Sequence, residues 1–137
     1  MNIVRASALD HGRAAILWTC IVLFLLRVVG QLEVLLLAPA WLPPMYDWYS
    51  GLIPYPILLP LQIVILTIMS AVATRQARPG RWKLWVRAIA IVYFAAMLMR
   101  LIVQLMRGPD SVIAAGGIPV AFHWVLALFL LVLARRN

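Results

Sequence analysis

The sequence predicts an all-α integral membrane protein built as a bundle of four transmembrane helices. Of the 137 residues, 66% are hydrophobic, whereas about half of the residues in a soluble domain are apolar. The mean hydropathy is +1.01, and the apolar residues fall into four runs, each long enough to span a bilayer, for which about 17 to 25 residues are needed. We therefore expect one transmembrane bundle over residues 1–137, with spans at about 14–37, 54–73, 84–106 and 118–134.

The distribution of charge predicts the orientation of the bundle. The chain has a formal net charge of +8, and most of its basic residues precede the first run, follow the second or end the chain. The first and third connections together hold only Arg107, beside Asp47 and Asp110. Because cytoplasmic loops are enriched in Lys and Arg, we expect both termini in the cytoplasm and a cytoplasmic-type membrane, inner or plasma. The basic residues then serve topology and contact lipid headgroups, and no nucleic acid is expected.

The two halves of the chain share a pattern. Arg27-Val-Val-Gly-Gln31 and Arg100-Leu-Ile-Val-Gln104 are each followed by leucine, and an Ile-Pro pair opens each returning run, at residues 53–54 and 118–119. Short patterns also recur by chance in leucine-rich sequence. The pattern therefore leaves open whether the bundle consists of two tandem helical hairpins.

Strongly polar residues inside the apolar runs predict a site. A guanidinium at membrane depth costs at least about 2.5 kcal/mol, so such a group faces a partner, a cavity or a ligand. Residues four apart share a helix face, which pairs Arg27 with Gln31 and Arg100 with Gln104. A rise of 1.5 Å per residue places all of these groups in the outer half of the membrane. The candidate ligand-binding residues are Arg27, Gln31, Glu33, Gln62, Arg100, Gln104 and His123.

The arginine excess of this cluster favours a binding function. Guanidinium and amide groups donate to phosphate, carboxylate or quinone oxygens, so we expect the cluster to bind an anionic or polar headgroup of a lipid or quinone-like ligand. The alternative is that the same groups bond to one another and fix the helices, in an accessory or assembly subunit of a larger membrane complex. A small oligomeric transporter is a further alternative. The expected partners are membrane lipids, other membrane subunits or further copies of the chain.

Other chemistry finds little support in the sequence. His123 is the only histidine within a run, so two histidines of one chain cannot ligate a haem. The whole chain has four aspartate and glutamate residues. These few carboxylates do not support a set of metal ligands or a carboxylate pair for hydrolysis. We therefore expect no enzyme activity, assign no catalytic residue or metal ligand, and cannot name a cofactor.

Proline and aromatic residues shape the expected outer surface. The connection at residues 38–53 is rich in both, which predicts a structured cap. Its residues Tyr46, Trp48 and Tyr49 are expected either to anchor the cap at the membrane interface or to cover the mouth of a cavity. Pro60, close to Gln62, predicts either a kink or a break in the second run.

Overall fold

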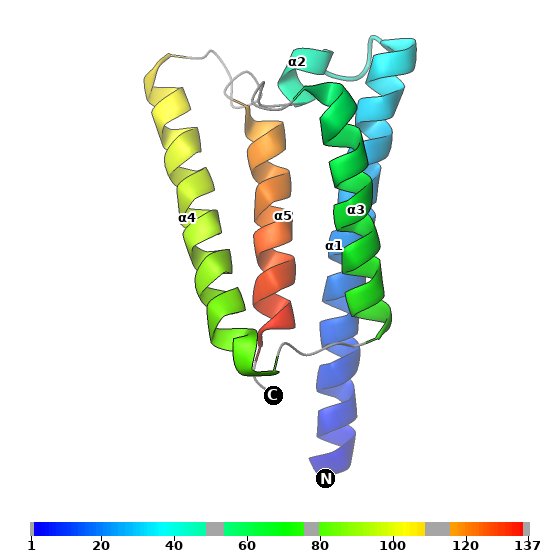
Figure 1. The fold of residues 1–137 in the computed structure, drawn as a ribbon, viewed down its shortest axis with the longest axis vertical. Coiled ribbons are helices and arrows are strands. Elements are labelled where there is room, and N and C mark those ends of the chain that lie inside the picture. The colour runs from blue at the N-terminus through cyan, green and yellow to red at the C-terminus, as the bar shows by residue number, and fades with distance from the viewer. Residues whose placement is uncertain (1, 49–53, 76–79, 109–115, 136–137) are drawn as a thin grey trace.

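The computed structural model describes the backbone of residues 2–48, 54–75, 80–108 and 116–135, and the side chains from residue 11 onward. Over these residues the protein is all-helical, which confirms the predicted class (Figure 1). The elements are α1 (Asn2–Leu37), α2 (Met45–Trp48), α3 (Tyr55–Thr74), the 3-10 turn η1 (Gly80–Trp82), α4 (Lys83–Met106) and α5 (Gly117–Leu133).

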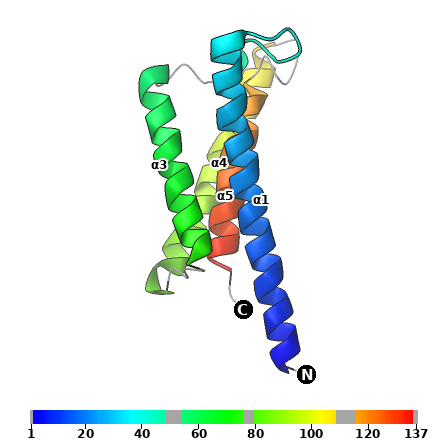
Figure 2. The ribbon, with the colours of Figure 1, turned by 90° about the vertical axis from the view of Figure 1, so that its right-hand side faces the viewer.

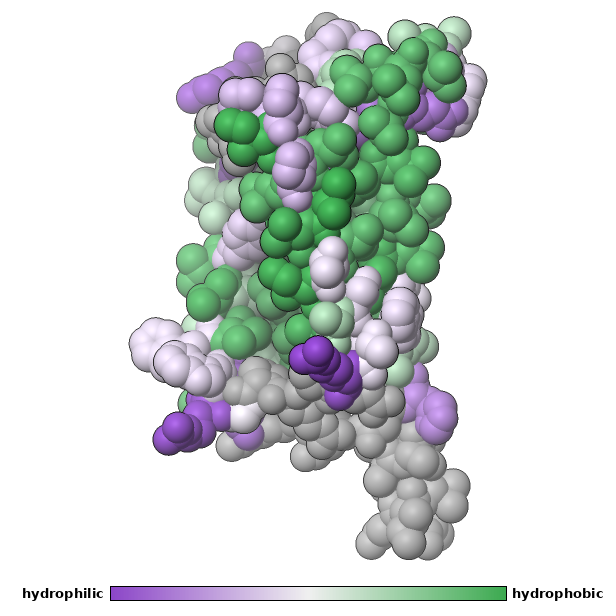
Figure 3. All heavy atoms as spheres, turned by 45° about the vertical axis from the view of Figure 1, so that its right-hand side comes forward, coloured by the Kyte–Doolittle hydropathy of each residue, from purple (hydrophilic) through white to green (hydrophobic). Residues whose placement is uncertain are grey.

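Three helical segments are long and apolar enough to cross a membrane. They are His11–Leu37 of α1, Tyr55–Thr74 of α3, and Gly80–Met106 of η1 and α4. The apolar helix α5 has 17 residues, about the lower limit for a span. In the view of Figure 3, a hydrophobic band crosses the middle of the molecule and hydrophilic residues gather toward its two ends. Helix length and this surface make the chain a membrane protein.

The helices pack in the order α3, α1, α5, α4. Helix α3 packs on α1, α4 packs on α5, and α1 and α5 pack on each other at the centre. No Cα atoms of α3 and α4 lie within 8 Å of each other. Figure 1 shows α5 between them, and Figure 2 shows them apart toward the cap end. The bundle is therefore open along one side, between α3 and α4.

The two ends of the bundle differ. Helix α1 begins and α5 ends at the same end, which we call the terminal end, whereas α2 lies at the other, the cap end (Figure 1). Toward the terminal end, α1, α3 and α5 share a hydrophobic core that includes Leu17, Met69 and Phe129. Contacts among apolar side chains in lipid are stabilised by close van der Waals packing rather than by removal from water. This core joins α1, α3 and α5 toward the terminal end.

The two helical hairpins are not related by a simple two-fold axis. Such an axis would relate α1 to α4 and α3 to α5, so α3 and α4 would pack on each other as α1 and α5 do. Helices α3 and α4, however, have no Cα atoms within 8 Å of each other. Each hairpin does pack within itself, α1 on α3 and α4 on α5. The departure from symmetry is the opening between α3 and α4.

Pro60 does not break α3. The helix is continuous from Tyr55 to Thr74, with Pro60 inside it. Gln62 is therefore placed by regular helix geometry, on the same continuous element as the core residue Met69.

Candidate ligand-binding site

A cavity of about 340 Å³ lies in the cap half of the bundle, within the range of roughly 300–1,000 Å³ found for ligand pockets. It is lined by Phe24 and Arg27 of α1, Leu58, Leu61, Gln62 and Ile65 of α3, Tyr93, Met97 and Arg100 of α4, and Pro119, Phe122, His123 and Leu126 of α5. All four long helices therefore contribute to one site. It lies on the side where α3 and α4 are separated.

The polar residues of the cavity lie within the depth of the bundle. By helix rise, Gln62, Arg100 and His123 are about 10 Å from the cap ends of their helices, and Arg27 is about 15 Å from the cap end of α1. These four residues were predicted from the sequence as site residues. The fold brings them to one cavity from four different helices.

Arg27 is held in place with part of its hydrogen-bonding capacity unused. Its side chain is 7% exposed, its Nη2 donates to the backbone oxygen of Trp48 at 3.3 Å, and its guanidinium carbon lies 5.4 Å from the centroid of the Phe122 ring. Its Nε is buried and has no partner among the described residues. Buried polar groups are normally hydrogen-bonded, so Arg27 keeps unused hydrogen-bonding capacity at a residue that lines the cavity.

A pair of glutamines links α1, α3 and the cap. Gln31 is fully buried, and its Nε2 donates to the backbone oxygen of Trp48 at 2.9 Å. Gln62 Nε2 in turn donates to Gln31 Oε1 at 2.8 Å. Gln62 Oε1 is buried without a partner in the described part of the chain. Gln31 is thus used within the protein and does not line the cavity, whereas Gln62 both bonds to Gln31 and lines the cavity.

The cap is fastened to α1 by Trp48. A Cβ atom at Gly30 would lie 2.8 Å from the Trp48 ring, so the ring occupies space that only glycine leaves open. The Trp48 indole Nε1 donates to the backbone oxygen of Pro43 at 2.9 Å. Trp48 is buried, whereas Tyr46 is exposed; Tyr49 lies outside the described residues. The contact between Trp48 and α1 was not predicted from the sequence. Its one local sign is Gly30, a glycine within the first apolar run, between Arg27 and Gln31.

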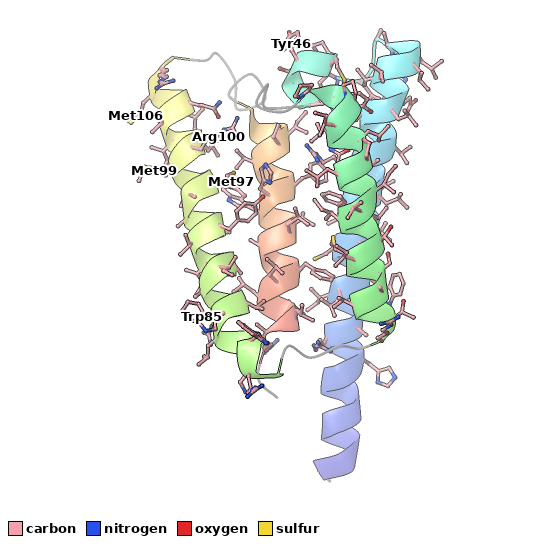
Figure 4. The ribbon with its side chains drawn as sticks, viewed as in Figure 1. Tyr46, Trp85, Met97, Met99, Arg100 and Met106 are labelled. Atoms are coloured by element: carbon pink, nitrogen blue, oxygen red, sulfur yellow. The ribbon has the colours of Figure 1, made fainter. Side chains whose placement is uncertain are left out.

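Arg100 places a second guanidinium at the cavity. Arg100 and Met97 extend from α4 toward α5, whereas Met99 and Met106 extend away from the bundle (Figure 4). Arg100 is partly buried, and no aspartate or glutamate is among the described residues that line the cavity. In the described part of the chain, two arginines thus share a cavity that no carboxylate lines, and an unpaired charge in a low-dielectric site is costly.

His123 is fixed by an aromatic neighbour. The Tyr93 hydroxyl and His123 Nδ1 share a hydrogen bond, and the two rings meet edge to face with centroids 5.4 Å apart. The bond occupies Nδ1 and leaves Nε2 for other partners. Tyr93 was not predicted as a site residue, although it lies on the α4 face that also carries Met97 and Arg100.

Besides Gln31, two more of the predicted residues, Glu33 and Gln104, do not line the cavity. Glu33 is partly exposed on α1 and does not line it. Gln104 lies beside Gly116, where its Oε1 is 3.4 Å from the position that a Cβ would take. The cavity therefore has a narrower polar lining than the sequence predicted, with Arg27, Gln62, Arg100 and His123 from that prediction and Tyr93 in addition.

The donors of this site suit oxygen acceptors rather than a metal ion. Among the described residues, no three His, Cys, Asp or Glu side chains gather in a way that could hold a metal ion. The fold and the site together define an all-α membrane protein with a cationic cavity inside its apolar bundle. Comparisons with protein-family models, with curated proteins and with solved structures give no match.

Proposed function

We propose that this protein binds the anionic or polar headgroup of a lipid or quinone-like ligand in the cavity between α3 and α4. The observation that carries the proposal is the pair Arg27 and Arg100, which line one cavity that no described carboxylate lines. Two residues of the lining, Arg27 and Gln62, also keep buried polar atoms, Nε and Oε1, without partners among the described residues. A bound acceptor group would satisfy the guanidinium donors and offset their charge.

The separation of α3 and α4 supports access from the membrane. The two helices have no Cα atoms within 8 Å of each other, so a ligand dissolved in the bilayer would enter sideways without separating a packed helix pair.

For the topology, we propose four membrane crossings with the cap end outside and both termini in the cytoplasm of an inner- or plasma-type membrane. Exposed Arg75, Arg81 and Arg87 lie at the terminal end of the bundle, as expected for a cytoplasmic side. The cavity then lies in the outer half of the membrane.

A titration with headgroup-matched amphiphiles tests the binding proposal. The purified protein in a nonionic detergent is titrated with a short-chain phosphatidic acid and, separately, with the corresponding zwitterionic phosphatidylcholine, while its tryptophan fluorescence is followed. We expect saturable binding of the anionic amphiphile. In the Arg100→Met variant, affinity should fall about tenfold or more, because a charge-assisted hydrogen bond is lost.

Arg107→Met is the matched control. Arg107 follows α4, is exposed and does not line the cavity, so its replacement removes the same charge from the same end of the helix without touching the site. Equal loss of affinity in Arg100→Met and Arg107→Met would reduce the binding to general surface charge and overturn the proposal.

The second candidate function is an accessory subunit of a larger membrane complex. In the described part of the chain, α5 is the only other long helix with Cα atoms within 8 Å of α4. The side chains of Met99 and Met106 on the outer face of α4 are exposed, which would suit a partner helix as well as lipid. Mild extraction from the native membrane separates the two candidates. Stoichiometric partner subunits would support the accessory role, and a small particle carrying lipid would support the binding role.

A further inference from the structure

We propose that the ligand is an anionic amphiphile, such as a lipid phosphate, whose apolar chain lies along the groove between α3 and α4 toward the terminal end. This inference rests on the proposed headgroup site and names the class of ligand and the place of its chain. Two observations support it: a second cavity adjoins the cavity described above, and two arginines line the first cavity.

The second cavity measures about 360 Å³ and is lined by apolar residues of α3, α4 and α5 together with Tyr93. It shares Ile65, Tyr93 and Leu126 with the first cavity, which we call the headgroup cavity, so the two cavities adjoin. From there it runs to Val72 on α3 and Leu133 on α5. Val72 lies ten residues beyond Gln62 on α3, which corresponds to about 15 Å.

The two cavities differ in character along this line. The headgroup cavity is lined by Arg27, Gln62, Arg100 and His123. Among the described residues that line the second cavity, only Tyr93, at the junction, has a polar side-chain group. A ligand that fills both must carry acceptor oxygens at one end and an apolar chain at the other. The length of about 15 Å equals about half of a bilayer's hydrocarbon thickness, which suits a single lipid chain.

The charge of the headgroup cavity selects an anion over a quinone. Arg27 is 7% exposed, Arg100 is partly buried, and the described lining contains no acid. A neutral quinone would leave both guanidiniums without a counter-charge in a low-dielectric site, whereas a phosphate provides both charge and paired oxygens for a guanidinium fork.

Photo-crosslinking tests this placement. The probe is dodecyl phosphate with a diazirine in the third of its alkyl chain that is farthest from the phosphate. The full-length protein is reconstituted in phosphatidylcholine nanodiscs, irradiated, and mapped by peptide mass spectrometry. We expect crosslinks at Ile68 and Val72 of α3 and at Ile89 of α4, which line the second cavity. Crosslinks at Val64 and Val92, which are exposed and line neither cavity, should be much weaker.

Arg100→Met should lower the yield at the groove positions about tenfold, with Arg107→Met unchanged. An excess of unlabelled dodecyl phosphate should suppress the crosslinks, whereas inorganic phosphate at the same concentration should not. If inorganic phosphate competes equally, the site takes the free anion and the chain placement is wrong.

Equal crosslinking yields at Val64, at Val92 and at the groove positions would indicate ordinary lipid contact and would overturn the placement of the chain in the groove. Saturable binding in the titration of the headgroup site would still support the proposed function in that case. If neither the titration nor the competition experiment gave saturable binding of the anionic amphiphile, the proposed function would be contradicted as well. An Ile68→Trp variant adds an independent check, because it fills the groove at an exposed position. It should reduce crosslinking at Val72, and the neighbouring Val64→Trp should not.

Discussion

Gln62 of α3 donates a 2.8 Å hydrogen bond to Gln31 of α1 in the interior of the bundle. Gln31 in turn donates a hydrogen bond to the backbone oxygen of Trp48 in the cap. Both glutamine side chains are almost completely buried. The polar groups inside this membrane protein therefore differ in role: Gln31 is bonded within the chain and does not line the cavity, whereas Arg100 lines the cavity. This division can be tested residue by residue.

Replacing Gln31 with leucine should destabilise the protein. The change removes two hydrogen bonds and leaves the Gln62 amide without its acceptor, at a cost of about 1–3 kcal/mol. Thermal unfolding in detergent measures the effect. Gln104→Leu, at the corresponding position of the Arg-x-x-x-Gln pattern in α4, is the control, because Gln104 Oε1 has no partner among the described residues. An equal loss of stability in both variants would contradict the division.

Replacing Arg100 with methionine should leave the stability of the ligand-free protein unchanged or raise it. No carboxylate is among the described residues lining the cavity to which Arg100 contributes, so the change removes a partly buried charge that the interior does not neutralise. The same variant should lose the anionic amphiphile. A marked fall in the unfolding temperature of ligand-free Arg100→Met would show instead that this arginine holds the helices together.

Gly30→Ala should displace the cap. The new Cβ would approach the Trp48 ring to 2.8 Å, and overpacking of this kind costs about 1–3 kcal/mol. Gly12→Ala on the same helix has nothing within 4 Å of the new atom and should be neutral or stabilising by up to about 1 kcal/mol. The midpoint of thermal unfolding compares the two variants. Equal behaviour would mean that Trp48 does not rest on α1.

Tyr93→Phe should release the ring of His123. In a His11→Gln background, His123 is the only histidine of the chain, so its ring nitrogens give unambiguous ¹⁵N NMR signals. With Tyr93 present, the bond at Nδ1 should hold one tautomer and one ring orientation. We expect a mixture of tautomers in Tyr93→Phe. Identical spectra would show that the hydroxyl does not control this histidine.

The proposed topology predicts an asymmetric labelling pattern. In a Cys20→Ser background, Ala40→Cys at the cap end should react with a membrane-impermeant maleimide added to intact cells. Thr74→Cys at the terminal end should react only after permeabilisation. Both positions are exposed, so accessibility rather than burial decides the result. The reverse pattern would invert the orientation and place the cavity in the inner half of the membrane.

The sequence was sufficient for the helical class because the signals for it are local. Apolar runs of membrane length and their flanking charges can be counted along the chain. Spacing and depth also singled out Arg27, Gln62, Arg100 and His123, since a polar residue in an apolar run needs a reason.

What the sequence could not provide is helix rotation and the order of packing. The repeated Arg-x-x-x-Gln pattern suggested similar roles for Gln31 and Gln104, yet the fold buries Gln31 against Trp48 and sets Gln104 beside Gly116. The opening between α3 and α4 depends on contacts between distant segments. The bond between Tyr93 and His123 joins residues 30 positions apart, so no local pattern marks it.

Native mass spectrometry of the protein, extracted gently from its own membrane, tests the central claim most directly. We expect a bound species with the mass of a phosphate-bearing amphiphile, present in the wild type and in Arg107→Met and absent from Arg27→Leu and Arg100→Met. A wild-type spectrum without any bound small molecule, or the same mass retained after both arginines of the cavity are replaced, would contradict it.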